Sequence, residues 1–404
     1  MPAQRSIPFG IIGCGLMGRE LASAMARWNH LVGVDFRPRI VSACDTDRAT
    51  LARFGEMVEG ARLCDTYAQV LNDPGVEAVY IAVPHHLHEE LYIAAIAAGK
   101  HLLAEKPFGI DKPACDRIMA AVREHPSVLV RCSSEFPFFP GAQRIIHMAR
   151  DERGGFGRIL EARCGLLHSS DLDPDKPINW KRQARYCGEY GCMGDLGMHA
   201  VHVPLRLGWT PRDVRAMLTK VVSQRPEKSA SPDAASTSPP RERRNMVPCD
   251  TWDNALLACT VGDSRDSEFP LLLEMKRIAP GHTNTWFFEV YGTRLSARFS
   301  TRFPRTLETL PYTNGQPQAW HVQDLGYHSA YPAITGPIFE FGFPDAIQQM
   351  LAAFCDELTH GRDAMKQPFH CATPEEAAAS HALFTAALAS SRNDTVERAA
   401  PIPG

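Results

Sequence analysis

The feature that most constrains the fold is a glycine-rich segment near the amino terminus, residues 7–19. A short apolar run typical of a buried parallel strand precedes Gly13, Gly15 and Gly18 at GxGxxG spacing, and an alanine-rich helix is expected from about Met17 to Trp28. We expect Gly13 to permit a tight turn, Gly15 to let a pyrophosphate approach the main chain, and Gly18 to let the helix pack closely on the strand. The helix N-terminus would offer free N–H groups to phosphates. A plain glycine turn is the alternative interpretation.

The second apolar segment, residues 39–44, supports the dinucleotide interpretation because it ends at an acid, Asp45. In a doubly wound sheet such an acid lies against the hydroxyls of the adenosine ribose. Asp45 lies farther along than usual, after a long connection over residues 30–38. A carboxylate there would favour NAD, because it would repel a 2′-phosphate, although Arg48 keeps NADP open as an alternative. Asp45 could instead cap the helix that starts near Asp47.

Strands and helices then alternate as in right-handed βαβ units, so we predict an α/β fold with a parallel sheet. The further strands are expected at residues 78–83, 101–104 and 127–132, and the helices at 47–56, 89–98 and 112–124, with a short one after Thr66. Ligands of such sheets bind beyond the carboxyl ends of the strands, which is where Asp45, Pro84 and Lys106 fall.

The character of the sequence changes at Phe136, where aromatic residues and prolines predict a domain crossing. We therefore expect a Rossmann domain over residues 1–135 and an α+β domain over 136–404. Partly alternating strands at 158–167, 271–278, 285–291 and 295–300 predict an open, largely antiparallel sheet, with helices at 141–150, 344–360 and 374–391. The segment 223–244, rich in Ser, Pro and charge, is predicted to be a mobile surface insertion, with an ordered loop as the alternative.

Composition excludes several classes of protein. The 404 residues carry a formal net charge of −3, which favours neither nucleic acid nor an anionic membrane as a partner. No apolar run is long enough to span a membrane and no signal peptide is apparent, so we expect a cytoplasmic protein. Its twelve cysteines contain no CxxC pair, which predicts reduced, mostly buried thiols. Cys187 and Cys192 are the closest pair, and we expect neither them nor other residues to bind a metal.

Lys106 is the first candidate catalytic residue. It lies between Glu105 and Pro107, directly after the strand at 101–104, so its position is well defined. A lysine there can hydrogen-bond a substrate hydroxyl, and its pKa can fall beside a nicotinamide cation. The alternative is a surface lysine paired with Glu105.

Asp195 and His199 form the second candidate group. Because they are four residues apart, they share one face of a helix, where the carboxylate can orient the imidazole for proton transfer. Alternatively, Asp195 caps the helix and His199 is a core residue. His202 lies on another flank and is expected to be structural. Trp180, followed by Lys181, could form a wall of a sugar pocket or simply pack in the core.

These motifs, in this order, resemble the glucose-fructose oxidoreductase and inositol dehydrogenase (Gfo/Idh/MocA) family. The similarity covers nearly the whole chain and extends to residues 279–284 and 290–293. The Glu-Lys-Pro element combined with Asp-x-x-x-His is its most specific part. The resemblance implies a Rossmann domain joined to an α+β domain with an open antiparallel sheet, NAD or NADP in the cleft, and homodimers or homotetramers built sheet to sheet.

The resemblance also implies roles for single residues. Lys106 would be the active-site lysine, Asp195 the assisting acid and His199 the proton acceptor, with Trp180 beside the substrate. The residues implied in cofactor binding are Gly13, Cys14, Gly15, Leu16, Met17, Gly18, Asp45, Val83, Pro84, His85, His88, Glu105 and Lys106. There are three departures from the family pattern: His85 replaces the usual asparagine, residues 188–191 replace three consecutive glycines, and the usual arginine-phenylalanine pair around residues 136–139 is missing. The changed glycines and the insertion beside them are expected to alter the pocket wall.

The leading hypothesis is an NAD(P)-dependent oxidoreductase acting on a secondary hydroxyl of a sugar, polyol or related small molecule. A second hypothesis is a glycoside hydrolase that transiently oxidises the sugar, eliminates the aglycone and regenerates NAD. A third is a nucleotide-sensing binding protein without turnover, which the presence of Lys106, Asp195 and His199 argues against.

Overall fold

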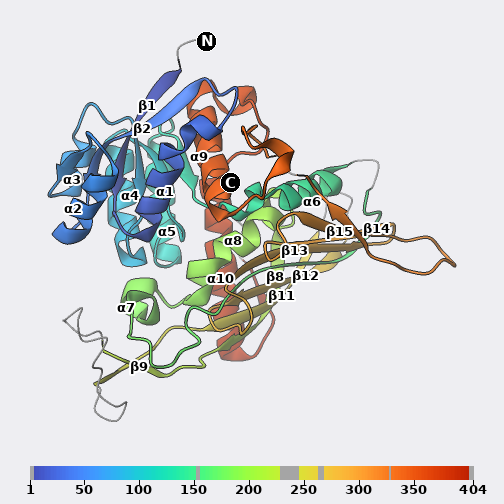
Figure 1. The fold of residues 1–404 in the computed structure, drawn as a ribbon. Coiled ribbons are helices and arrows are strands. Elements are labelled where there is room, and N and C mark those ends of the chain that lie inside the picture. Colours follow the sequence, from blue (N-terminus) through green and yellow to red (C-terminus); the bar gives the residue numbers. More distant parts are fainter. Residues whose placement is uncertain (1–3, 152–154, 228–244, 263–267, 327–328, 400–404) are drawn as a thin grey trace.

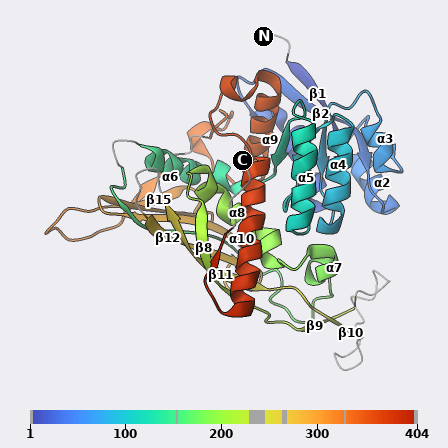
Figure 2. The same ribbon diagram turned by 180° about the vertical axis from the view of Figure 1, so that it is seen from behind.

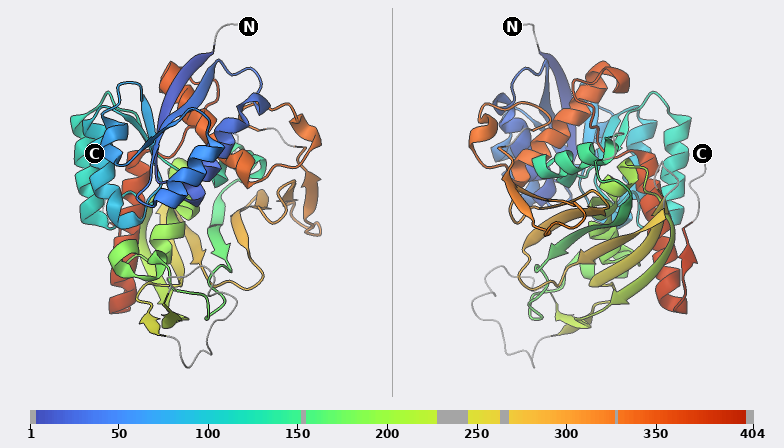
Figure 3. Two further views of the ribbon diagram at one scale, coloured as in Figure 1. Left: turned by 60° about the vertical axis from the view of Figure 1, so that its left-hand side comes forward. Right: turned by 90° about the vertical axis from the view of Figure 1, so that its right-hand side faces the viewer.

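The computed structural model describes residues 4–151, 155–227, 245–262, 268–326 and 329–399 (Figure 1). Within these residues the chain forms a parallel six-stranded sheet near the amino terminus and a nine-stranded sheet from the later part of the chain. In the two views of Figure 3, the blue strands of the first sheet and the green-to-orange strands of the second lie in separate parts of the molecule. The red carboxyl-terminal helices run beside both parts.

The first sheet has the strand order β3-β2-β1-β4-β5-β6, and every neighbouring pair is parallel. Its strands are β1 (Arg5–Ile12), β2 (Phe36–Cys44), β3 (Arg62–Cys64), β4 (Ala78–Ile81), β5 (His101–Ala104) and β6 (Val130–Cys132). This order confirms the predicted doubly wound sheet. β2 begins at Phe36, earlier than expected, so the long connection predicted over residues 30–38 is wrong in its last three residues. Pro38 is accommodated because β2 pairs with β3 only from Ser42 onward, leaving one neighbour at the proline.

The helices of this part are α1 (Leu16–Ala26), α2 (Arg48–Met57), α3 (Tyr67–Leu71), α4 (His88–Ala97) and α5 (Lys112–Glu124). Two of them begin at aspartates whose side chains accept main-chain hydrogen bonds. Asp47 caps α2 by accepting from the Thr50 N–H at 2.8 Å, and Asp111 caps α5 by accepting from the Ala114 N–H at 2.8 Å. The helix cap considered for Asp45 therefore belongs to Asp47.

A carboxyl-terminal helix, α9 (Phe343–His360), packs on the first sheet rather than on the second. The Gln348 side chain donates to the main-chain carbonyls of Ala24 and Arg27 at 3.1 and 2.8 Å, where α1 ends. Glu357 pairs with Arg131 of β6, and both side chains are largely buried. The predicted domain boundary at residue 135 stays a prediction. In space, α9 belongs to the layer that covers the first sheet, although its residues lie in the segment predicted as the second domain.

The second sheet is largely antiparallel, as predicted, and has the order β16-β15-β14-β13-β7-β12-β11-β8-β17. Only β7 and β12 pair in parallel among its described strands. The strands are β7 (Ile159–His168), β8 (Pro211–Thr219), β11 (Asn254–Gly262), β12 (Glu268–Lys276), β13 (Asn284–Gly292), β14 (Leu295–Ser300), β15 (Thr306–Pro311), β16 (His321–Asp324) and β17 (Glu397–Arg398).

Helices cover one face of this sheet, as Figure 2 shows from behind. α8 (Cys192–Arg206) packs on β7 and β12, α10 (Pro374–Asn393) on β8, and α6 (Pro140–Arg150) on β14. A short helix, α7 (Ala184–Cys187), precedes α8. The predicted insertion contains β9 (Gln224–Pro226), which pairs antiparallel with β10 (Met246–Pro248) just beyond its end, and its residues 228–244 lie outside the described residues.

All twelve cysteines are free and buried, which confirms the expected reduced thiols. Burial raises the pKa of the Cys192 thiol to about 12. In the part of the chain that the structure describes, no helix is both long and apolar enough to cross a bilayer.

Candidate active site

A cavity of about 680 Å³ lies at the carboxyl ends of the first sheet's strands. Its lining includes most of the residues expected to bind a dinucleotide: Gly13, Gly15, Leu16, Met17, Asp45, Val83, Pro84, His85, Glu105 and Lys106. Three of the expected residues, Cys14, Gly18 and His88, are not among those that line it. His88 lies behind the wall, where its ring nitrogens are 2.7 and 2.9 Å from the carbonyl oxygens of Pro107 and Val83.

The three glycines differ in what a side chain would meet. Gly13 has a φ of +96°, and a Cβ there would lie 2.2 Å from the Ala82 carbonyl oxygen. A Cβ on Gly18 would lie 2.2 Å from the Gly13 carbonyl oxygen, so helix and strand are in close contact as expected. At Gly15 a Cβ would meet no atom within 4 Å. This open space beside the N-terminus of α1 fits a pyrophosphate held by main-chain N–H groups.

Asp45 is held at the edge of the same cavity by two main-chain hydrogen bonds. Its Oδ2 accepts from the Cys14 N–H and its Oδ1 from the Asp47 N–H, both at 2.8 Å. Each carboxylate oxygen can accept a further hydrogen bond, so the group remains available to ribose hydroxyls. Cys14 thus takes part through its main chain, while its buried thiol points away to the Cys44 carbonyl.

A second cavity of about 470 Å³ adjoins the first and lies between the two sheets. The two cavities share five polar or aromatic residues: Glu105, Lys106, Trp180, Lys181 and Asp195. Glu135, His199, Arg277 and Phe343 line only the second cavity. A small molecule in the second cavity would therefore meet the end of a dinucleotide in the first.

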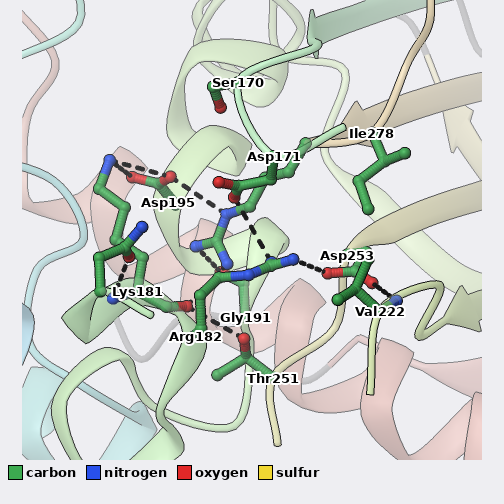
Figure 4. A network of polar contacts seen from close by, with 12 residues as sticks. Ser170, Asp171, Lys181, Arg182, Gly191, Asp195, Val222, Thr251, Asp253 and Ile278 are labelled. Atoms are coloured by element: carbon green, nitrogen blue, oxygen red, sulfur yellow. Dashed lines mark hydrogen bonds and ion pairs between the residues drawn. The ribbon is translucent and has the colours of Figure 1, made fainter. Parts of the chain in front are cut away.

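Asp195 is surrounded by three cationic side chains, of which Figure 4 labels Lys181 beside the carboxylate. Lys181 Nζ lies 2.9 Å from its Oδ1, Lys106 Nζ 3.2 Å from the same atom, and Arg277 Nε 3.3 Å from its Oδ2. Burial by itself would raise the pKa of Asp195, but Lys181, Lys106 and Arg277 together hold it well below the usual range. Asp195 is thus a permanent carboxylate.

Lys106 is fixed by the same cluster. Besides the carboxylate, its Nζ donates to the Asp195 carbonyl oxygen at 2.6 Å, and its side chain is 15% exposed. Burial lowers the pKa of Lys106, but Asp195 and Glu105 outweigh that effect and raise it. The Glu105 carboxylate accepts from the Tyr80 hydroxyl at 2.6 Å. Lys106 is therefore not the surface partner of Glu105, and it remains a charged donor facing both cavities.

His199 lies on the same side of α8 as Asp195, but its nearest polar neighbours come from another segment. Its Nδ1 is 3.4 Å from the Ser134 hydroxyl and 3.9 Å from Glu135 Oε2, both just beyond β6. Burial first, and then Lys106, keep the pKa of His199 well below its ordinary value, so the ring is neutral. The expectation that Asp195 orients the imidazole is therefore corrected: its carboxylate hydrogen-bonds to Lys106, Lys181 and Arg277.

The structure also decides whether Asp195 caps α8 and whether His202 is structural. The helix begins at Cys192 after Gly191, and the Asp195 side chain contacts the lysines instead of capping it. His202 is structural, as expected: it is fully buried, 3.0 Å from Arg206, and burial lowers its pKa to about 3.

Trp180 separates the two cavities and contributes to both walls. The His85 ring packs edge-on against it with 4.8 Å between ring centroids, and His85 Nδ1 lies 3.1 Å from the Cys187 carbonyl oxygen. The histidine that replaces the family's usual asparagine thus supports the tryptophan.

A buried ion pair fixes the segment that carries Lys181. Arg182 and Asp253 are both fully buried and paired, and the Asp253 carboxylate also accepts from the Val222 N–H at 3.0 Å (Figure 4). Thr251 donates to the Lys181 carbonyl oxygen at 3.0 Å. These contacts define the backbone position from which Lys181 reaches Asp195.

Two residues at the site, Glu135 and Arg277, were not predicted to act there. Lys181 was considered with Trp180 as a wall of the sugar pocket, but its contact with Asp195 was not predicted. Glu135 comes directly after a strand of the first sheet, and the rule that drew attention to Lys106 would have identified it. Arg277 follows β12 of the second sheet, and no sequence pattern marks it; only the tertiary contact with Asp195 does.

Comparisons with known proteins agree with this geometry. Residues 7–131 match the model of the oxidoreductase family with an NAD-binding Rossmann fold, Gfo/Idh/MocA. Levoglucosan dehydrogenase of Pseudarthrobacter phenanthrenivorans is 28% identical over 84% of this chain and 82% of the relative. Inositol 2-dehydrogenase 2 of Saccharopolyspora erythraea is 30% identical over 40% of this chain and 43% of the relative.

A solved structure has the same fold over the whole chain. The complex of levoglucosan dehydrogenase with NADH and levoglucosan superposes with a TM-score of 0.81 at 20% identity, covering 98% of this chain and all of that one. Together with the glycine motif and the dinucleotide cavity, these findings support the Gfo/Idh/MocA family of NAD-binding oxidoreductases, whose Rossmann-fold model matches residues 7–131.

Proposed function

We propose that the protein is an NAD(P)-dependent dehydrogenase that interconverts a secondary hydroxyl and a ketone on a sugar, a polyol or a related small molecule. The observation that carries this proposal is the junction of the two cavities at Lys106, Asp195 and Trp180. A dehydrogenase needs the carbon that loses hydride to meet the nicotinamide ring, while the hydroxyl meets a base.

The bound dinucleotide would accept the hydride, and the residues of this chain would handle the proton and the charge. His199, kept neutral by its burial, would accept the hydroxyl proton. Lys106, kept charged by Asp195, would stabilise the negative charge that develops on oxygen. Trp180 would pack against the sugar ring, since it lines the second cavity near the junction.

Asp45 supports NAD over NADP. Its carboxylate lies in the dinucleotide cavity and is held by two main-chain N–H groups, so it cannot move away from a 2′-phosphate. Arg48, which could have bound that phosphate, points to solvent beside Asp65 with its side chain 92% exposed.

The test is to incubate the purified protein with levoglucosan, myo-inositol and a panel of free sugars, using NAD⁺ and NADP⁺ in turn. We expect reduced nicotinamide to accumulate with at least one compound, and faster with NAD⁺. Phenol released from aryl glycosides without accumulation of NADH would indicate redox-neutral glycoside cleavage instead. Binding of NADH without turnover of any compound would indicate a sensor.

The proposed assembly is a homodimer or homotetramer formed through the uncovered face of the second sheet. The register places Met217 of β8 beside Leu256 of β11, and both side chains are exposed, by 63% and 39%. Exposed apolar residues that adjoin on a sheet face favour contact with another subunit. Light scattering after gel filtration should give a multiple of the 44.7 kDa chain, and Leu256→Arg should reduce it. A monomeric parent protein would contradict this assembly.

A further inference from the structure

Glu135 is a buried carboxyl group in the second cavity that the proposed chemistry does not use. It follows β6, is 3% exposed and lines the cavity beside His199. Within the described residues, its carboxyl oxygens meet no hydrogen-bonding group except its own main-chain N–H. Burying a carboxyl with so few partners is costly, and a role in the cavity would account for its presence.

In the proposed reaction, His199 must pass on the proton that it accepts from the substrate. Once His199 has accepted the substrate proton it is an imidazolium, and burial and Lys106 both disfavour that charge. The Ser134 hydroxyl, 3.4 Å from Nδ1, can pass a proton on but cannot keep one. Asp195 is bound by three cations, which makes its carboxylate a poor proton acceptor. Among the described residues, Glu135 is the carboxyl paired with the ring, with Oε2 3.9 Å from Nδ1.

We propose that Glu135 acts through His199 as a proton-relay and positioning residue. As the substrate O–H bond breaks, its proton forms a new N–H bond on one ring nitrogen of His199, and the proton on Nδ1 passes to the Glu135 carboxylate, directly or through the Ser134 hydroxyl. The hydride leaves carbon with its electron pair and reduces NAD⁺ to NADH. The proton then leaves Glu135 for solvent. This proposal rests on the proposed dehydrogenase function.

Several charged and titratable groups face this relay. Glu105 and Lys106 approach Glu135 from the end of β5, and Tyr80 approaches from β4. His199 is further faced by Asp195 and His202 of its own helix and by His168 of β7. Burial, and then Glu105, raise the pKa of Glu135 to about 8, while Lys106 opposes the rise. The relay requires Glu135 to be ionised, so alcohol oxidation should speed up as the pH rises through this range, at a lower pH when NAD⁺ adds its positive charge.

The first test compares the pH profiles of the parent enzyme, Glu135→Gln and Glu135→Asp at saturating NAD⁺. We expect Glu135→Gln to lose the alkaline rise and to lower kcat by about 10–10²-fold, less than the loss of a general base, with little change in KM. Glu135→Asp should keep the rise. The control is Glu268→Gln, an exposed residue paired with Arg212 on the second sheet. A Glu135→Gln enzyme with the parental profile, or with only KM changed, would overturn the relay.

A second readout does not depend on turnover. The raised pKa means that the folded protein holds a proton on Glu135 that the unfolded chain releases near pH 4.5. This group therefore lowers the stability of the parent as pH rises from about 4.5 to 8, and the glutamine variant escapes that loss. The Tm of Glu135→Gln relative to the parent should increase from pH 6 to pH 9, and a constant difference would contradict the proposal. A parent without any turnover would contradict the dehydrogenase and the relay together.

Discussion

At the residue scale, burial and neighbouring charges set the protonation states of the few side chains that form the site. Three cations around Asp195 keep it ionised and in turn keep Lys106 charged, while burial keeps His199 neutral. A charged donor and a neutral base beside one cavity are the pair that hydroxyl oxidation requires.

The first prediction concerns the base. His199→Ala should lower kcat by about 10²–10⁴-fold, because the group that accepts the hydroxyl proton directly is then missing. Binding of NADH should be unchanged, since His199 lines only the second cavity. Steady-state kinetics and NADH fluorescence titration measure the two effects. His321→Ala, on the exposed edge strand β16, serves as the control. An alanine variant that oxidises its substrate at the parental rate would refute the assignment.

At the scale of elements, the turn between β1 and α1 contains two glycines, and each is needed for a different physical reason. Gly13 needs its positive φ and close contact for folding, whereas the space beside Gly15 is empty in the protein itself. We therefore expect Gly13 to serve stability and Gly15 to leave room for a ligand.

A matched pair of substitutions separates these roles. Gly13→Ala should destabilise the protein by about 1–3 kcal/mol or more, because alanine is strained at φ > 0 and its Cβ would approach Ala82. Gly15→Ala should leave Tm nearly unchanged and weaken NADH binding, by about 10-fold or more if one phosphate contact worth about 1.5 kcal/mol is lost. Thermal melts and NADH titrations measure both. Equal losses of stability in the two variants would contradict this division.

At the scale of the whole molecule, a helix near the carboxyl end of the chain packs on the amino-terminal sheet. α9, about 200 residues beyond β6 along the chain, places Glu357 against Arg131 and Gln348 against the end of α1. Residues 343–360 therefore stabilise the dinucleotide-binding part although they belong to the segment assigned to the second domain.

Breaking the contact between α9 and the first sheet should destabilise the dinucleotide-binding part as well as the helix. Glu357→Gln leaves the Arg131 guanidinium buried without its carboxylate, a change that costs about 3–5 kcal/mol for buried pairs. We expect one cooperative loss of Tm, seen alike by circular dichroism and by release of bound NADH. The control is Glu268→Gln, which removes the partner of the exposed Arg212 and should change Tm little. Loss of α9 packing with NADH binding intact would show that the two parts fold independently.

Local sequence patterns were sufficient to predict much of the fold and part of the candidate site. Strand periodicity, the glycine spacing and the acid after β2 predicted the Rossmann sheet and most of its cavity, because these signals act between neighbours in the chain or at one sheet edge. The antiparallel second sheet and the buried thiols followed from alternation and composition. Lys106 could be named because it follows a predicted strand, and Asp195 and His199 because they are four residues apart on one helix face.

Only the tertiary structure decided which of these groups touch. The sequence periodicity placed Asp195 beside His199 on one helix face, but three cations from three separate segments attract the carboxylate, and the imidazole instead faces Ser134 and Glu135. The packing of α9 on the first sheet was likewise invisible in the sequence. The reason is that charge pairing and packing depend on distances in space, and residues far apart in the chain meet only after the two sheets have come together.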